Sequence, residues 1–228
     1  MPPALPSPYT DSKPQRRLLW LEAVALFVAV PATLRVWWYP PALPVALAAA
    51  ALASAWWLRH QSLPYSPLWR GPAYRSRTER QQLRALLRRF LLSAGLLVAA
   101  MWLWAPAGQL FDLLRTQPRL WLGVLAFYPL FSVYPQELVY RALFFALYRP
   151  LFSSARATAA ASAAAFGFVH IVFQNWPAVL LTLLGGWLFA DTYARTYSLR
   201  LVWLEHALYG GLMFTVGLGR YFYHGSVG

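Results

Sequence analysis

Apolar runs of roughly membrane-spanning length recur along this chain and limit the folds that it can adopt. About twenty consecutive apolar residues let one α-helix cross the hydrocarbon core of a bilayer. Only 12% of the residues are charged and 59% are hydrophobic, whereas soluble domains carry about a quarter charged residues. We therefore expect an all-α, polytopic integral membrane bundle.

The runs predict about seven transmembrane helices, near residues 18–34, 41–58, 90–106, 120–148, 157–173, 176–190 and 201–218. The fourth is too long for one straight crossing, and Pro129 and Pro135 should kink or break it. An eighth crossing follows if this segment is really two helices. We interpret the first run as a retained span, with a cleaved signal peptide of shorter apolar core as the alternative.

The same pattern predicts the domain organisation. Residues 1–17 form a disordered cytoplasmic tail, and residues 18–106 form N-terminal membrane helices with a basic cytoplasmic loop at 59–89. Residues 120–219 form a core that carries the candidate site, and residues 220–228 form a C-terminal tail. The loop should continue from Thr78 as a helix directly into the third span.

The charge distribution predicts orientation and partners. The basic loop contains eight arginines and one acidic residue, Glu79. With the N-terminus cytoplasmic, most of the 20 Lys and Arg residues lie on the cytoplasmic side, as the positive-inside rule requires. Because the basic stripe adjoins a span, we expect it to contact anionic lipid and no nucleic acid. We expect an integral protein of a bacterial inner (plasma) membrane. The chain has no cysteine, which excludes disulfides, a thiolate nucleophile and Cys-based metal sites.

Of the ionisable side chains inside the predicted spans, four are candidates for a shared functional site. Glu137 and Arg141 are four residues apart and can pair on one helix face. His170 and His206 lie in the fifth and seventh spans. Ionisable residues in a membrane are costly and are a functional-site hypothesis by default. We expect the four to converge on one cavity; a structural polar network and a transporter's proton relay are the alternatives.

Other polar positions predict structure rather than chemistry. Asp191 and Arg195 also have i, i+4 spacing, and we expect them to cap and anchor the end of the sixth span. Gly185 and Gly186 indicate close helix packing. Glu205 is about 100° around the helix from His206, so it either orients a neighbour or faces the loop.

Three motifs in order carry a resemblance. Glu137-x-x-x-Arg141, then Phe166-x-x-x-His170, then His206 in a late span resembles the CAAX-protease and bacteriocin-processing (CPBP, or Abi) family of intramembrane proteases. The resemblance covers roughly Tyr128 to Gly219. It implies an intramembrane endopeptidase acting on a membrane-anchored or lipidated peptide or protein.

The resemblance also implies roles for these residues. Glu137 and His170 would activate a water molecule, His206 would donate to the oxyanion, and Arg141 would hold the Glu137 carboxylate ionised and oriented. Each such positioned group is typically worth 10²–10⁴ in rate. Gln136 and Phe166 would be accessory residues, with Gln136 at the edge of the cavity.

Two positions depart from the family pattern. Gln136 stands where the family has a first glutamate, and Gly210 stands where it has an asparagine one turn after the third-motif histidine. Glutamine cannot accept a proton at neutral pH. Either Glu137 is therefore the base, or the protein is an impaired relative that acts as a membrane binding or immunity factor.

The metal question depends on the same residues. Glu137, His170 and His206 would make a zinc set of the two-His, one-Glu type. With Glu137 as a ligand, no motif carboxylate would remain as the base unless Glu205 reached the site. We therefore favour a metal-free glutamic mechanism without a cofactor, with a zinc metalloprotease as the alternative.

Overall fold

The computed structural model describes residues 13–37, 42–61 and 79–222, and every regular element in these ranges is a helix. Its contacts group the chain into two compact units. Unit 1 consists of Met1–Tyr74 and Pro135–Val202, and unit 2 consists of Arg75–Tyr134 and Trp203–Gly228. Each unit therefore combines segments that are distant in sequence, and the domain organisation described above stays a prediction. Arg70, Arg75, Arg77 and His224 lie outside the described residues.

Unit 1 contains most of the helices and the first two motifs. Its elements are α1 (Lys13–Val24), η1 (Ala25–Ala29), α2 (Val30–Val36), α3 (Ala42–Arg59), α7 (Tyr134–Glu137, whose first residue belongs to unit 2), η3 (Leu138–Leu143), α8 (Phe144–Tyr148), η4 (Arg149–Leu151), α9 (Ala155–Val169), η5 (His170–Phe173) and α10 (Trp176–Thr196). The first helix begins at Lys13, earlier than the predicted start of the first span at Leu18.

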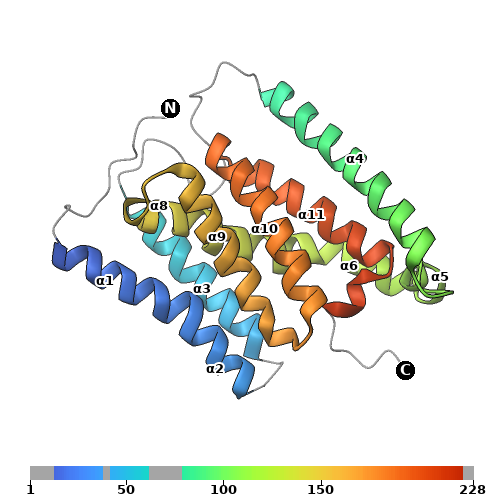
Figure 1. Cartoon of the computed structure of the whole chain (residues 1–228), viewed down its shortest axis with the longest axis horizontal. Coiled ribbons are helices and arrows are strands. Elements are labelled where there is room, and N and C mark those ends of the chain that lie inside the picture. The colour runs from blue at the N-terminus through green and yellow to red at the C-terminus, as the bar shows by residue number, and fades with distance from the viewer. Residues whose placement is uncertain (1–12, 38–41, 62–78, 223–228) are drawn as a thin grey trace. The chain divides into compact units, whose positions relative to one another are not determined.

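Helices α9 and α10 form a tight pair that lies side by side in Figure 1. The polypeptide can turn between them because Asn175 caps α10 by accepting a hydrogen bond from the Ala178 N–H. A Cβ atom at Gly167 would lie 3.0 Å from the Leu183 Cβ, so glycine allows this close approach. The pair forms one wall around the segment that carries Glu137 and Arg141.

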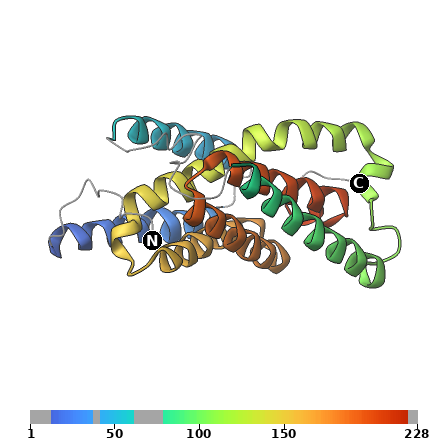
Figure 2. The same ribbon diagram turned by 90° about the horizontal axis from the view of Figure 1, so that it is seen from above.

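The η3–α8 segment packs between α3 and α9 (Figure 2). Phe27 of η1 packs against it on the N-terminal side, with ring centroids 5.5 Å from Tyr140 and 5.2 Å from Phe144. Tyr140, Ala142, Phe144 and Phe145 are all buried. The segment with the first motif is thus enclosed by helices from both ends of unit 1.

Unit 2 is described by α4 (Glu79–Trp104), α5 (Asp112–Thr116), α6 (Pro118–Tyr128), η2 (Pro129–Val133), most of α11 (Leu199–Thr215) and η6 (Leu218–Tyr221). From Glu79 onward the basic segment is part of one uninterrupted helix, α4, which continues into the predicted third span as expected. The Trp203 indole donates to the Pro129 carbonyl at 2.7 Å, and the Trp121 indole donates to the Thr215 hydroxyl at 3.0 Å. These bonds fix α11 against α6 and η2.

The helical run from Pro118 to Tyr148 passes through both prolines without breaking, and it changes pitch instead. In a regular α-helix the Pro135 ring would clash with the Phe131 carbonyl. Phe131 lies in η2, a π-helical stretch in which the Tyr134 N–H bonds to the Pro129 carbonyl. A second π-helical stretch, η3, contains Arg141. The predicted break is therefore absent, and the backbone takes a π-helical pitch between Pro129 and Pro135.

Four described helices are long and apolar enough to cross a membrane: Lys13–Val36, Arg80–Trp104, Ala155–Phe173 and Trp176–Thr196. Leu43–Arg59 is a shorter apolar helix. The predicted spans near 120–148 and 201–218 are not among the four, so seven or eight crossings are not confirmed. The all-helical fold is confirmed, and the apolar helices indicate an integral membrane protein.

Candidate functional site

Glu137 and Arg141 form the ion pair that their spacing predicted. Arg141 Nε lies 3.3 Å from Glu137 Oε2, and both side chains have no exposed surface. An arginine and a glutamate in a low-dielectric interior are stable only when the pair is well formed and has further hydrogen bonds. The surroundings of Arg141 supply those bonds.

Three helical segments hold the Arg141 guanidinium. Nη1 donates to the Ser162 hydroxyl at 3.0 Å and to the Tyr140 carbonyl at 3.3 Å, and Nη2 donates to the Gly186 carbonyl at 3.4 Å. Ser162 in turn donates to the Tyr140 carbonyl at 2.6 Å. The guanidinium is thereby tied to η3, α9 and α10, and it holds the Glu137 carboxylate in one place.

Phe166 connects the first motif to the second. The Arg141 Cζ lies 4.9 Å above the centroid of the Phe166 ring, a cation–π distance. The His170 ring contacts the same phenyl in an edge-type arrangement, with centroids 4.9 Å apart and planes inclined at 62°. Phe166, predicted as an accessory residue, thus contacts both a charged group of the first motif and the histidine of the second.

His170 begins the 3-10 helix at the end of α9 and is 7% exposed. Its Nδ1 lies 2.6 Å from the Phe166 carbonyl. A backbone carbonyl can only accept, so Nδ1 carries the proton and the neutral ring has its acceptor atom at Nε2. This is the tautomer that a proton acceptor needs.

Gly186 lets the α10 backbone reach the site. A Cβ atom there would lie 2.9 Å from Phe166 Cδ1 and 3.3 Å from the Ala163 carbonyl oxygen. Without it, the Gly186 carbonyl comes within hydrogen-bond distance of Arg141. The expectation that Gly186 marks close helix packing is confirmed. Its carbonyl also accepts a hydrogen bond from the buried Arg141 guanidinium.

Ser162 was not predicted, although the sequence contained a signal for it. Ser162, Phe166 and His170 are spaced by four residues, which places them on one face of α9. Gln136, predicted at the edge of the cavity, is half-buried. Arg195 pairs with Asp191 at 2.5 Å near the end of α10, as expected.

His206 lies in unit 2, where Tyr128 contacts it. The Tyr128 hydroxyl is 3.0 Å from His206 Nε2, and the imidazole is 6% exposed. Glu205 is fully buried and pairs with Arg89 of α4, so it orients a neighbour and does not face a loop. Arg89, predicted as part of the solvated basic loop, is 30% exposed and belongs to this pair.

The structure brings Glu137, Arg141, Phe166 and His170 together within unit 1. His206 belongs to the other unit, so the convergence of all four ionisable residues stays a prediction. Within each unit, the described residues contain no group of three His, Asp, Glu or Cys side chains that could hold a metal ion. The zinc set of Glu137, His170 and His206 is divided between the units and also stays a prediction.

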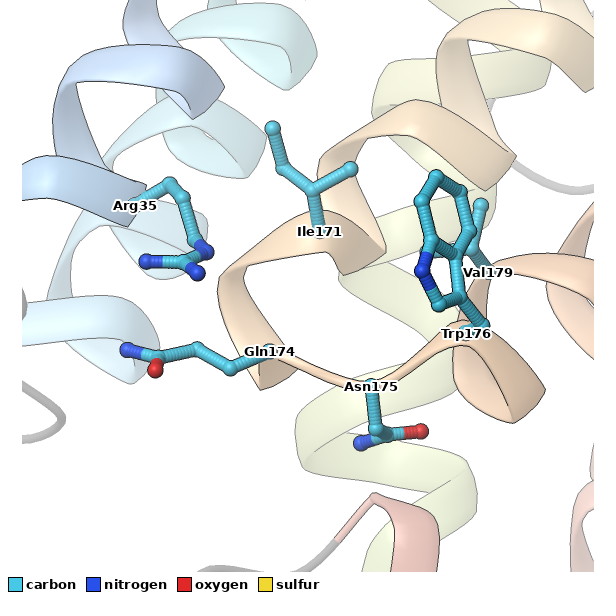
Figure 3. Close-up of a pocket in the computed structure, with 6 residues that line it drawn as sticks. All are labelled: Arg35, Ile171, Gln174, Asn175, Trp176 and Val179. Carbon is cyan, nitrogen blue, oxygen red and sulfur yellow. The ribbon is translucent and has the colours of Figure 1, made fainter.

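A pocket of about 160 Å³ adjoins the second motif in unit 1 (Figure 3). It is lined by Arg35, Ile171, Gln174, Asn175, Trp176 and Val179. Arg35 and Gln174 lie on one side of it and Trp176 on the other. Most of the lining residues come shortly after His170 in the sequence, but His170 and the other motif residues do not line the pocket.

The apolar helices and the enclosed Glu–Arg–Phe–His cluster define an integral membrane protein with a buried ionisable site. The family model described as "Type II CAAX prenyl endopeptidase Rce1-like" matches residues 117–212 of this chain. This is the CPBP (Abi) family, so the resemblance drawn from the motifs is confirmed over this segment. The match supports a membrane protease of the CAAX type at the general level. Searches of curated proteins and of solved structures gave no match.

Proposed function

We propose that this protein is an intramembrane endopeptidase that hydrolyses a peptide bond near the prenylated end of a membrane-associated protein. The substrate class comes from the family match over residues 117–212, which contains all three motifs. The chemistry comes from the cluster around Arg141. A peptide bond is cleaved when an activated water adds to its carbonyl carbon and the nitrogen leaves with a proton.

The observation that carries the proposal is the fully buried Glu137–Arg141 pair. An ionised carboxylate is the form that can accept a proton from water, and a neighbouring guanidinium stabilises that form. Arg141 is itself fixed by Ser162 and Gly186. In this proposal Glu137 is the general base, and Gln136 orients the water.

His170 is the second group of the proposed mechanism. Its proton on Nδ1 bonds to the Phe166 carbonyl, so Nε2 is the atom that exchanges a proton with the water or with the leaving nitrogen. Phe166 keeps the ring in place through an edge-type ring contact. His206 is proposed to stabilise the oxyanion. A metal-free reaction follows from these roles, since Glu137 is needed as the base.

The experiment uses the purified full chain in lipid vesicles and a peptide that ends in a prenylated cysteine followed by three residues. We expect release of the C-terminal tripeptide, no release from the matched unprenylated peptide, and the same rate after treatment with a chelator. Loss of cleavage in the chelator, restored by zinc, would replace the metal-free mechanism with the metal one. Cleavage of neither peptide would contradict the proposed activity.

Gln136→Glu separates an active enzyme from a binding relative. If Glu137 is the base, a second carboxylate next to it adds like-charge repulsion, and the rate stays equal or falls. A wild-type protein that binds the prenylated peptide without cleaving it, together with a Gln136→Glu variant that cleaves, would show that the natural protein is a binding relative.

A further inference from the structure

Two further hydrogen bonds between neighbouring helical segments hold Tyr128 and His206 against each other. Trp203, one turn before His206 on α11, donates to the Pro129 carbonyl. Trp121 and Thr215 form a second bond between α6 and α11 farther along. These bonds fix the register of the two helices, so the 3.0 Å approach of the Tyr128 hydroxyl to His206 Nε2 is a consequence of helix packing.

Gly210 leaves the space that the Tyr128 ring occupies. It follows His206 by four residues and therefore lies on the same face of α11. A Cβ atom at Gly210 would lie 2.5 Å from the Tyr128 hydroxyl oxygen and 2.7 Å from Cζ, closer than atoms can approach. Phe214 packs edge-on against the ring at 5.5 Å. Any other residue at 210 would displace Tyr128 from His206.

We propose that Tyr128 is the positioning residue of His206, and that its hydroxyl replaces the side chain absent at position 210. The family pattern has an asparagine one turn after this histidine, whereas this chain has Gly210 there. The hydroxyl that contacts the imidazole comes instead from a different helix. This inference rests on the proposed function only for the role of His206 in the reaction.

The contact fixes the orientation of the His206 ring and gives its Nε2 a hydrogen-bond partner. A neutral imidazole has one N–H donor and one acceptor nitrogen, and a hydroxyl can bond to either kind. Because Nε2 faces Tyr128, the N–H with which His206 would donate to an oxyanion is Nδ1–H, and in that tautomer the Tyr128 hydroxyl donates to Nε2. A donor that stabilises an oxyanion must be in place before the charge develops. Losing the hydroxyl therefore lowers kcat and leaves KM largely unchanged, because Tyr128 acts through His206 in the transition state.

Tyr128→Phe is the first test, with Tyr209→Phe as the matched control. Tyr209 is another tyrosine of unit 2, and its hydroxyl lies 2.6 Å from the Ser93 hydroxyl. We expect Tyr128→Phe to lower kcat about tenfold, the rate equivalent of one neutral hydrogen bond. The ¹⁵N spectrum of labelled histidine should show a changed His206 tautomer ratio. Tyr209→Phe should change neither.

Gly210→Ala and Gly211→Ala form the second pair. The alanine at 210 should displace the Tyr128 ring and reproduce both effects of Tyr128→Phe. A Cβ atom at Gly211 would meet only the end of the Leu125 side chain, at 3.0 Å, so Gly211→Ala should keep the wild-type tautomer ratio. The two variants have the same change in backbone freedom and differ in what the new methyl group meets.

Unchanged ¹⁵N shifts of His206 in both Tyr128→Phe and Gly210→Ala would overturn the inference, whatever the kinetics. A changed tautomer with unchanged kcat would overturn the catalytic part. The spectrum can be recorded on a protein that cleaves nothing. Failure of the proposed activity is therefore distinct from failure of this inference.

Discussion

Two ion pairs of the same spacing occur in unit 1, and they have different surroundings. Glu137 and Arg141 are completely buried, whereas the side chains of Arg195 and Asp191 are 47% and 29% exposed. Arg141 also bonds to Ser162 and to two carbonyls, and it lies over Phe166. The comparison teaches that i, i+4 spacing predicts a pair, while burial and additional partners decide its importance.

Glu137→Gln is expected to give the largest difference in kcat between variants of the buried pair and variants of the exposed pair. The amide keeps the shape of the side chain but cannot accept a proton at neutral pH, so kcat should fall by about 10²–10⁴-fold. Asp191→Asn makes the equivalent change in the exposed pair and should leave kcat near the wild-type value. The measurement is tripeptide release at saturating prenylated peptide, on variants that elute as folded protein. Equal rates for Glu137→Gln and wild type would remove Glu137 from the mechanism.

The free energies of unfolding of Arg141→Ala and Arg195→Ala allow a second comparison of the two ion pairs. Removing Arg141 leaves a buried carboxylate without its cation and should lower the free energy of unfolding by about 3–5 kcal/mol. Removing Arg195 should cost about 0–1 kcal/mol. Denaturant titration in mixed micelles would measure the free energy of unfolding of both variants. If Arg141→Ala does not fold, Arg141→Lys keeps the charge and loses the planar fork, and it should still be less stable than Arg195→Lys. Equal losses for the two lysine variants would contradict the distinction.

Gly186→Ala tests the close approach that supplies Arg141 with a carbonyl. The new methyl group would meet Phe166 at 2.9 Å, whereas the methyl group of Gly185→Ala would meet the Phe189 ring at 3.3–3.4 Å. Both variants gain the same helix propensity, so their difference isolates packing. We expect Gly186→Ala to be less stable by about 1–3 kcal/mol. Identical melting temperatures would show that α9 and α10 have room to separate.

Ser162→Ala should give the smallest effect. It removes the hydroxyl between Arg141 and the Tyr140 carbonyl, and side-chain hydrogen bonds in membrane proteins average about 0.6 kcal/mol with a maximum near 1.7. Ser54 is a matched control, because its buried hydroxyl bonds only to the Ala50 carbonyl of its own helix. A loss for Ser54→Ala as large as that for Ser162→Ala would show that the link to Arg141 adds nothing.

Local spacing was sufficient to predict the parts of the site that lie on one helix. Glu137 with Arg141 and Phe166 with His170 are each four residues apart, and the structure shows both contacts. The sequence did not indicate that Phe166 joins the two pairs, because that contact depends on how α9 packs against η3. Such packing is set by side chains distant in sequence, including Gly186 on α10.

The missed features have the same physical origin. Tyr128 and His206 are separated by 78 residues, and only the glycine at 210 indicated that another group needed the space. The prolines correctly marked the irregular segment but not its form, because the Pro129 carbonyl finds partners in the Tyr134 N–H and in the Trp203 indole, which is distant in sequence. The predicted number of spans depended on apolar length alone, and α11 has only 17 residues.

The partners of Arg141 also bear on the order in which the chain is made. Ser162 and Gly186 are synthesised after Arg141. The ribosome must therefore add α9 and the first half of α10 before these two residues can bond to the Arg141 guanidinium. On translocon insertion scales an arginine at the centre of a span costs about 2.5–3.5 kcal/mol. The nascent segment that carries the first motif is therefore the one least able to enter the bilayer alone. Its insertion should wait for the α9–α10 pair, and chains that end before Gly186 should leave this segment accessible to aqueous reagents.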